Sequence, residues 1–132
     1  MTKYSNKVYI LIQARFKSTR LPGKIFFEFF NEKVINRVVR IAKKINNDKN
    51  VFIISVSKKF NEILEEVAKK HNIKIFYGSE LNVYGRFKKF LEDQKIKPKY
   101  ICRLTSDNYL IQPSIVKRMI KEVKTSNYDY GY

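Results

Sequence analysis

The sequence predicts an α/β fold, with a mainly parallel sheet between helices in a Rossmann-like three-layer α/β/α arrangement. Short apolar, β-prone runs alternate with segments whose apolar residues recur every three or four positions. This alternation is typical of strand–helix–strand units, in which consecutive strands lie parallel. The chain has 132 residues, 44% of them hydrophobic. We therefore expect residues 1–132 to form a single α/β domain with a buried core.

The first half of the chain predicts two strands and two helices. Residues 7–14 form a continuous β-prone run that is typical of a buried strand. Apolar residues at helical spacing across 34–45 predict one amphipathic helix. Residues 51–56 predict the second strand, and apolar positions within 60–68 predict the second helix.

The second half repeats the pattern and places the expected site. Residues 73–77 and 100–105 predict strands, 83–91 predicts a helix, and a last helix opens at 113–114 with Ser114 as its expected N-cap. Right-handed crossovers favour the strand order 3-2-1-4, which reverses between strands 1 and 4. Ligands of such sheets bind at the carboxyl ends of the strands beside the reversal. The site is therefore expected where the loop after Ala14 meets the loop after Thr105.

The chain is strongly basic, with a formal net charge of +16. Much of the excess is lysine on the polar sides of the expected helices, which is compatible with an ordinary solvated surface. The first acidic residue is Glu28, whereas several cations precede it, among them Lys7, Arg15, Lys17, Arg20 and Lys24. The part of the chain before Glu28 is therefore suited to bind an anion. A basic nucleic-acid-binding protein is an alternative, but it rests on net charge alone, so we do not favour a nucleic-acid partner.

The composition also indicates a location. Apolar runs are far shorter than the ~20 residues of a membrane span, and residues 1–7 lack the apolar centre of a signal peptide. Cys102 is the only cysteine and cannot form an internal disulfide. We expect a cytoplasmic protein without a membrane partner.

The loop across residues 13–24 contains four cations, the hydroxyls of Ser18 and Thr19, and Gly23 after a proline. It matches neither the Walker P-loop nor the G-x-G-x-x-G fingerprint. Arg15 suits bidentate contact with a phosphate, and Lys24 suits contact as a mobile point charge. A solvated basic loop is the alternative interpretation.

Asp107 follows the fourth strand and is expected to face that loop. A lone carboxylate beside a phosphate site usually holds Mg²⁺, which prefers oxygen ligands. The alternative is an ordinary turn or capping aspartate. The topology brings both loops to one edge of the sheet, which favours the metal site.

Two stretches resemble the opening motif of the cytidylyltransferase family: Ile12-Gln13-Ala14-Arg15, and Ser18-Thr19-Arg20-Leu21-Pro22-Gly23-Lys24. This family includes CMP-Kdo synthetase and the acylneuraminate cytidylyltransferases, and the resemblance is strongest to the spore-coat polysaccharide biosynthesis protein F group. It continues at Tyr77-Gly78-Ser79, Val83-Tyr84-Gly85-Arg86-Phe87, Arg103-Leu104-Thr105-Ser106-Asp107 and Tyr128-Asp129-Tyr130. It thus covers essentially the whole chain and implies the nucleotide-diphospho-sugar transferase fold.

The resemblance implies a reaction, in which CMP passes from CTP to a sugar or sugar acid with Mg²⁺ as cofactor. It implies that Arg15 and Lys24 hold the triphosphate and that Asp107 binds the metal, so these three form the expected catalytic set. The backbone near Gln13 and Ala14 is expected beside the pyrimidine. The expected nucleotide-binding residues are Gln13, Ala14, Arg15, Ser18, Thr19, Arg20, Lys24, Arg86 and Arg103.

The chain departs from the family in three respects. Asn108-Tyr109 replaces a small residue followed by proline, and Tyr84-Gly85 replaces Leu-Asp. Family members are also longer, so we expect this nucleotide-binding domain to be the N-terminal portion of a longer fold. A truncated nucleotide-binding module with weak or absent catalysis is the alternative. Apolar residues in the tyrosine-rich tail suggest a homodimer.

Overall fold

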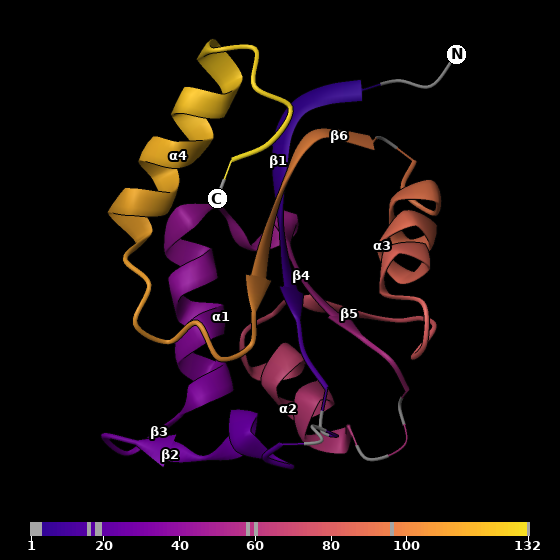
Figure 1. The fold of residues 1–132 in the computed structure, drawn as a ribbon. Helices are drawn as coiled ribbons and strands as arrows, with labels where there is room; N and C mark the ends of the chain where they lie inside the picture. Colours follow the sequence, from indigo (N-terminus) through magenta and orange to yellow (C-terminus); the bar gives the residue numbers. More distant parts are fainter. Residues whose placement is uncertain are drawn as a thin grey trace.

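The computed structural model describes residues 4–15, 17, 20–57, 59, 61–95 and 97–131. Its main sheet has four parallel strands in the order β5-β4-β1-β6 (Figure 1). These strands are β1 (Tyr4–Gln13), β4 (Val51–Ser55), β5 (Lys74–Tyr77) and β6 (Lys97–Thr105). In chain order this is 3-2-1-4, so the predicted topology is confirmed.

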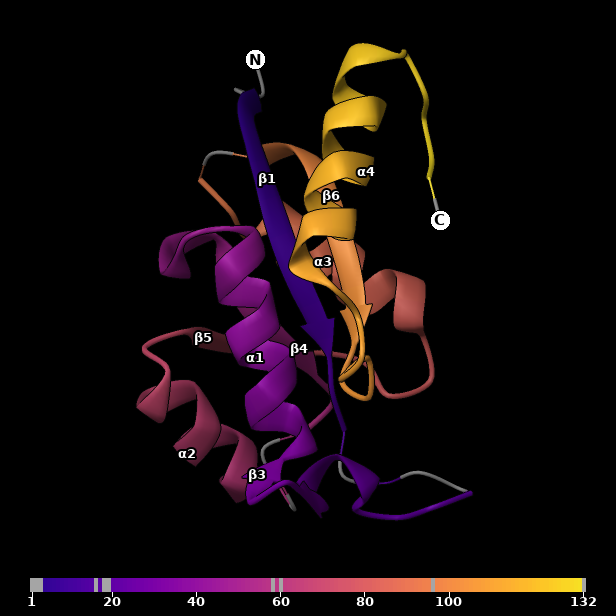
Figure 2. The same ribbon diagram turned by 90° about the vertical axis from the view of Figure 1, so that its left-hand side faces the viewer.

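Helices cover both faces of the sheet, as Figures 1 and 2 show. They are α1 (Val34–Ile45), α2 (Glu62–Lys70), α3 (Val83–Glu92) and α4 (Pro113–Thr125). Side chains of α1, α2 and α4 share one core cluster with Ile10 and Ile12 of β1 and Ile53 of β4. Leu11 and Ile54 point to the other face and pack against α3. The alternation along each strand therefore produces the three predicted layers.

β1 and β6 both begin earlier than the sequence predicts. β1 begins at Tyr4, before an irregularity in its register with β6 between Ser5 and Val8. β6 begins at Lys97 and includes Pro98. Proline usually indicates a strand boundary, but an edge strand tolerates it because one side of its backbone needs no sheet partner.

A small hairpin lies between β1 and α1, where the sequence predicts only a connection. It consists of β2 (Glu28–Phe29) and β3 (Glu32–Lys33). Its two turn residues have positive φ angles, 50° at Phe30 and 61° at Asn31, as a type I′ turn requires. Short 3₁₀ helices, η1 (Lys24–Phe26) and η2 (Asp48–Asn50), complete the described elements.

The predicted N-cap of α4 is wrong. The helix begins at Pro113 with Gln112 in the cap position, which places Ser114 inside the first turn. Proline is favoured at the first helical position because its φ is already helical and its missing N–H has no partner to lose there. None of the helices in the described part of the chain is long and apolar enough to cross a membrane.

Candidate functional site

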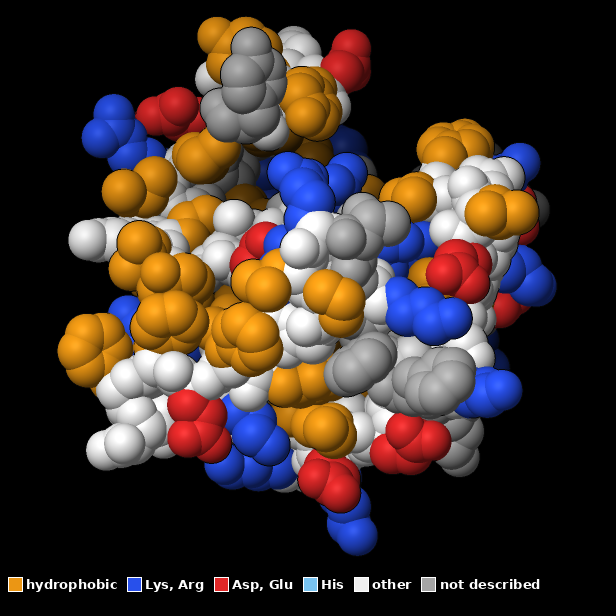
Figure 3. Space-filling view, turned by 60° about the horizontal axis from the view of Figure 1, so that its bottom comes forward, with side chains coloured by type: hydrophobic (Ala, Val, Ile, Leu, Met, Phe, Trp, Pro, Cys, Tyr) orange, Lys and Arg blue, Asp and Glu red, His pale blue; other side chains and the backbone are white. Residues whose placement is uncertain are grey.

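Two loops leave the neighbouring strands β1 and β6 at the carboxyl edge of the sheet, beside the reversal of strand order. Gln13 pairs in register with Ile54 on one side and with Thr105 on the other, so the strand ends are level. The Ser106 N–H donates to the Gln13 carbonyl oxygen at 3.0 Å and ties the two loops together. Figure 3 shows this end of the molecule, where Lys and Arg side chains are interspersed with acidic and hydrophobic ones.

Lys24 and Asp107 meet across these loops. Lys24 Nζ lies 2.5 Å from Asp107 Oδ2, although 83 positions separate the residues. Both side chains remain partly open to solvent, at 38% and 42% exposure. The hydrogen bond from Lys24 holds the pKa of Asp107 below its usual value. The expectation that these charges face one another is confirmed, whereas their roles toward a ligand stay predictions.

The local fold positions each member of this pair. Gly23 caps η1 with a φ of 72°, a left-handed conformation that glycine adopts without strain, and Lys24 follows directly. On the other side, Asn108 Oδ1 accepts hydrogen bonds from the Thr105 N–H and the Thr105 hydroxyl, both at 2.7 Å. These bonds close the turn that presents Asp107, which gives Asn108 a structural role beside the site.

The Asp107 turn is also supported from the hairpin side. The Tyr109 ring stacks on Phe29 of β2 with centroids 5.3 Å apart. The Tyr109 carbonyl oxygen accepts a hydrogen bond of 2.6 Å from Arg37 Nε. The unpredicted hairpin therefore braces the loop that carries the carboxylate.

Arg86 is a buried cation on α3, with a relative exposure of only 1%. Its Nε donates to the Ser79 carbonyl oxygen at 2.8 Å, but its Nη1 is buried without a hydrogen-bond partner. Burial lowers the pKa of its guanidinium, and the nearby Arg15 cation lowers it further. Arg15 and Arg86 thus lie near one another, and the Nη1 of Arg86 lacks an acceptor.

Glycines make room for this arrangement. A Cβ on Gly78 would lie 2.5 Å from Arg86 Cγ, so any side chain there would displace the arginine. At the start of α3, Asn82 Oδ1 caps the helix by accepting the Gly85 N–H at 2.7 Å. A Cβ on Gly85 would lie 2.6 Å from Asn82 Nδ2, so a larger residue there would crowd the capping side chain.

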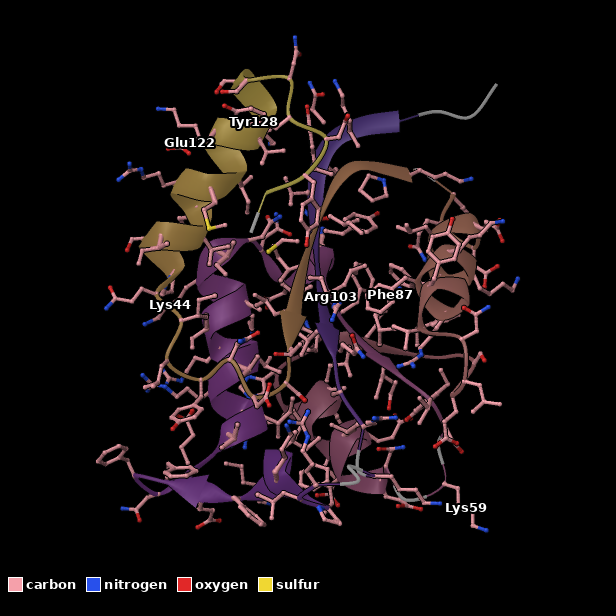
Figure 4. The ribbon with its side chains drawn as sticks, viewed as in Figure 1. Lys44, Lys59, Phe87, Arg103, Glu122 and Tyr128 are labelled. Atoms are coloured by element: carbon pink, nitrogen blue, oxygen red, sulfur yellow. The ribbon has the colours of Figure 1, made fainter. Side chains whose placement is uncertain are left out.

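The other predicted residues are placed less closely. Ala14 is buried beside the sheet edge, and Arg15 and Arg20 are exposed in the loop. Arg103 is exposed on β6, in register with Leu11 and so on the α3 side of the sheet (Figure 4). Ser18 and Thr19 lie outside the described residues.

Sequence reasoning missed Asn82, Gly78, Phe29 and Tyr109 as supports of the site. Asn82 carried a usable signal, because asparagine directly before an apolar helical pattern is a common N-cap. The Phe29–Tyr109 stack joins segments 80 positions apart, and nothing in the local sequence indicates such a pair.

The donor set suits one metal ion only in part. Within the described residues no three His, Cys, Asp or Glu side chains converge as a metal cluster. Asp107 is an ionised, partly exposed carboxylate, and Mg²⁺ commonly uses one or two carboxylates together with phosphate oxygens and water. The site therefore fits Mg²⁺ that arrives with a phosphorylated ligand.

Fold and site together define a doubly wound α/β protein with a charged site at its strand reversal. The family model described as cytidylyltransferase matches residues 9–132. The chain therefore belongs to the cytidylyltransferase family.

Individual relatives agree with this assignment. The chain is 34% identical over 131 residues to the spore coat polysaccharide biosynthesis protein SpsF of Bacillus subtilis (strain 168), covering 96% of this chain and 54% of SpsF. It is 27% identical over 127 residues to the 3-deoxy-manno-octulosonate cytidylyltransferase of Rickettsia bellii, covering 92% of this chain and 50% of the relative.

Solved structures show the same fold. A cytidylyltransferase from Leptospira borgpetersenii serovar Hardjo-bovis has a TM-score of 0.81 and 32% identity, over 92% of this chain and 51% of that one. A CMP:2-keto-3-deoxy-manno-octonic acid synthetase complexed with CTP has a TM-score of 0.72 and 19% identity, over 92% of this chain and 48% of that one. The chain thus spans about half the length of the relatives that it matches.

Proposed function

We propose that this chain binds CTP with Mg²⁺ at the carboxyl edge of its sheet and transfers CMP to a sugar or sugar acid for surface-polysaccharide synthesis. The observation that carries this proposal is the contact between Lys24 and Asp107 beside the reversal of strand order. Membership of the cytidylyltransferase family supports the choice of nucleotide. A cytoplasmic location goes with the proposal, because the chain has one cysteine and CTP is an intracellular substrate.

Each charged residue has a distinct role in this proposal. Arg15 presents a planar guanidinium that can hold two phosphate oxygens at once. Lys24 is long and flexible, so its ammonium can turn from Asp107 to the triphosphate. Asp107, released from Lys24, then has its carboxylate oxygens available to hold Mg²⁺. A bound Mg²⁺ would supply positive charge to the phosphate oxygens as negative charge builds up during transfer.

The reaction needs positioning more than a reactive side chain. An oxygen of the sugar or sugar acid forms a bond to the α-phosphorus of CTP, while the bond from that phosphorus to the α–β bridging oxygen breaks. Pyrophosphate leaves with that electron pair, and an attacking hydroxyl loses its proton to solvent. Arg15 and Lys24 stabilise the negative charge on the triphosphate during this exchange.

Binding is tested by calorimetry with CTP and Mg²⁺ on the parent chain and on Lys24→Met. We expect Lys24→Met to weaken binding roughly 10- to 100-fold, which corresponds to the loss of one charge-assisted hydrogen bond. Lys89→Met is the matched control, because Lys89 also pairs with an aspartate, Asp93, at 2.6 Å but lies on the outer side of α3. A folded parent chain that does not bind CTP at millimolar concentration would contradict the proposal.

Transfer is tested separately from binding, because the chain spans about half the length of its relatives. Pyrophosphate release is measured with CTP, Mg²⁺ and a panel of sugars and sugar acids. Release that depends on both the acceptor and Lys24 supports transfer, whereas CTP binding without release for any acceptor supports a binding module.

A homodimer is a further part of the proposal. Tyr128 and Tyr130 of the tail are 62% and 76% exposed, a large apolar area for an isolated chain. Sedimentation velocity across a range of concentrations tests it, and a single monomeric species throughout would argue against it.

A further inference from the structure

Three buried side-chain polar atoms in the described part of the chain have no hydrogen-bond partner: Gln13 Oε1, Ser55 Oγ and Arg86 Nη1. Folded proteins pair nearly all such atoms, so each exception calls for an explanation. Gln13 and Ser55 are the last residues of neighbouring strands β1 and β4, and Arg86 lies on α3. All three are thus near the ends of strands where the nucleotide is proposed to bind.

Gln13 and Arg86 share one face of the sheet, whereas Ser55 does not. Leu11 of β1 packs against α3, and Gln13 follows it by two positions, so its side chain leaves the strand on the same side. Arg86 reaches that side from α3 itself. Ser55 follows Ile53, which packs in the cluster on the opposite face with α1 and α2. The face next to α3 therefore presents one unpaired acceptor and one unpaired cationic donor.

The Arg86 donor is held in place before any ligand arrives. The bond from its Nε to the Ser79 carbonyl oxygen and the absence of a side chain at Gly78 define the path of the arginine. The cations Arg15 and Arg86 lie close enough to repel one another. The Gln13 side-chain oxygen is itself buried and has no hydrogen-bond donor, so the amide presents an unpaired acceptor on this face.

The base of the nucleotide can satisfy both groups. Cytosine carries an exocyclic amino group, which donates, on the same edge as a ring nitrogen and a carbonyl oxygen, which accept. Uracil has a carbonyl oxygen in place of the amino group, so it would set an acceptor against the Gln13 oxygen. A site whose buried polar group would lose its partner rejects the wrong ligand more strongly than an apolar site does.

We propose that the Gln13 side-chain oxygen accepts a hydrogen bond from the cytosine amino group, with Arg86 donating to the carbonyl oxygen of the base, and that Gln13 thereby sets a preference for CTP over UTP. This inference rests on the proposed function, since it assigns the base within the same nucleotide site.

The test compares the dissociation constants of CTP and UTP, each with Mg²⁺, for the parent chain and for Gln13→Leu. We expect the parent to prefer CTP, and Gln13→Leu to weaken CTP binding roughly 3- to 10-fold, the worth of one hydrogen bond, with little change for UTP. Gln13→Glu retains an acceptor and should retain the preference for CTP. Circular dichroism establishes that each variant is folded.

Ser55→Ala is the matched control, because it also removes an unpaired buried polar atom at a strand end but on the opposite face. Its ratio of CTP to UTP affinity should equal that of the parent. If Gln13→Leu binds both nucleotides with the parent's ratio, or if the parent does not discriminate between them, this inference is overturned while nucleotide binding stands. If the folded parent binds neither nucleotide, the proposed function and this inference fall together.

Discussion

Phe30 has a backbone conformation that bulky side chains rarely adopt. Its φ is 50°, and its side chain is 99% exposed at the tip of the β2–β3 hairpin. A left-handed conformation costs an ordinary residue about 1–2 kcal/mol, and asparagine tolerates it better. We expect Phe30→Asn to stabilise the chain by about 0.5–1 kcal/mol, measured by urea unfolding. Phe27→Asn is the control, because Phe27 is 46% exposed and has extended backbone. Equal effects of the two substitutions would argue against strain at Phe30.

His71 contributes stability that depends on pH. Burial lowers its pKa below the usual 6.5, so folding favours the neutral ring, whose Nε2 lies 3.0 Å from Asn36 Oδ1. The unfolded chain therefore binds the proton more tightly, and stability is lost as the pH falls from about 6.5 through the lower folded value. The charged groups that act on the ring are Lys43, Lys70, Glu32 and Arg40.

Acid unfolding of the parent and of His71→Gln checks this expectation. We expect the unfolding free energy of the parent to fall between pH 7.5 and pH 5.5, and that of His71→Gln to fall less. The lowered pKa values of Glu32 and Asp107 act only below their usual values of 4.5 and 3.8, outside this interval. Parallel pH profiles for the two proteins would rule out this role for His71.

The first turn of helix α3 contributes to the stability of the chain and also positions a residue of the site. Asn82 caps it, and Arg86 follows one turn later. Replacement of an asparagine N-cap by alanine typically costs about 1 kcal/mol. We expect Asn82→Ala to lower the free energy of unfolding by about that amount and to weaken CTP binding, because the first turn positions Arg86. If Asn82→Ala lowers the free energy of unfolding but leaves the affinity for CTP unchanged, the helix cap does not position the nucleotide site.

The main elements could be predicted from the sequence because their burial follows either a continuous apolar run, as in β4, or a helical period, as in α1. The strands of β1 and β4 and the apolar face of α1 carry that signal in consecutive residues. The strand order then follows from general rules of chain crossover, and it places Lys24 opposite Asp107.

Features made by distant or strained residues could not be predicted in the same way. The hairpin turn at Phe30 and Asn31 lacks the usual glycine, and Pro98 obscures the start of β6. The burial of Arg86 depends on space left by Gly78, and its unpaired Nη1 depends on the surrounding side chains. Those properties come from tertiary packing, so a pattern of residue types does not reveal them.

The whole molecule carries a charge of +16, which acts at longer range than the site. We expect weak, sequence-independent binding to DNA at low salt, because a basic surface attracts any polyanion. A protein that makes six to ten phosphate contacts loses about 10³–10⁵ in affinity between 50 and 200 mM salt. CTP binding should decline far less over that range, because it uses a few short contacts. Titrations of DNA and CTP at both salt concentrations distinguish the two, and equal salt dependence would indicate that CTP binds only by net charge.

Under the proposed function, the Lys24–Asp107 pair would also couple the binding of magnesium to that of the nucleotide. Without nucleotide the lysine already neutralises the aspartate, so a divalent ion that approaches alone must compete with a covalently tethered cation. When a triphosphate binds, its greater negative charge would draw the Lys24 ammonium away from Asp107. The lysine would then no longer compete with a divalent ion for the carboxylate. Ion and nucleotide should consequently enter together, and the empty protein should be nearly indifferent to free magnesium.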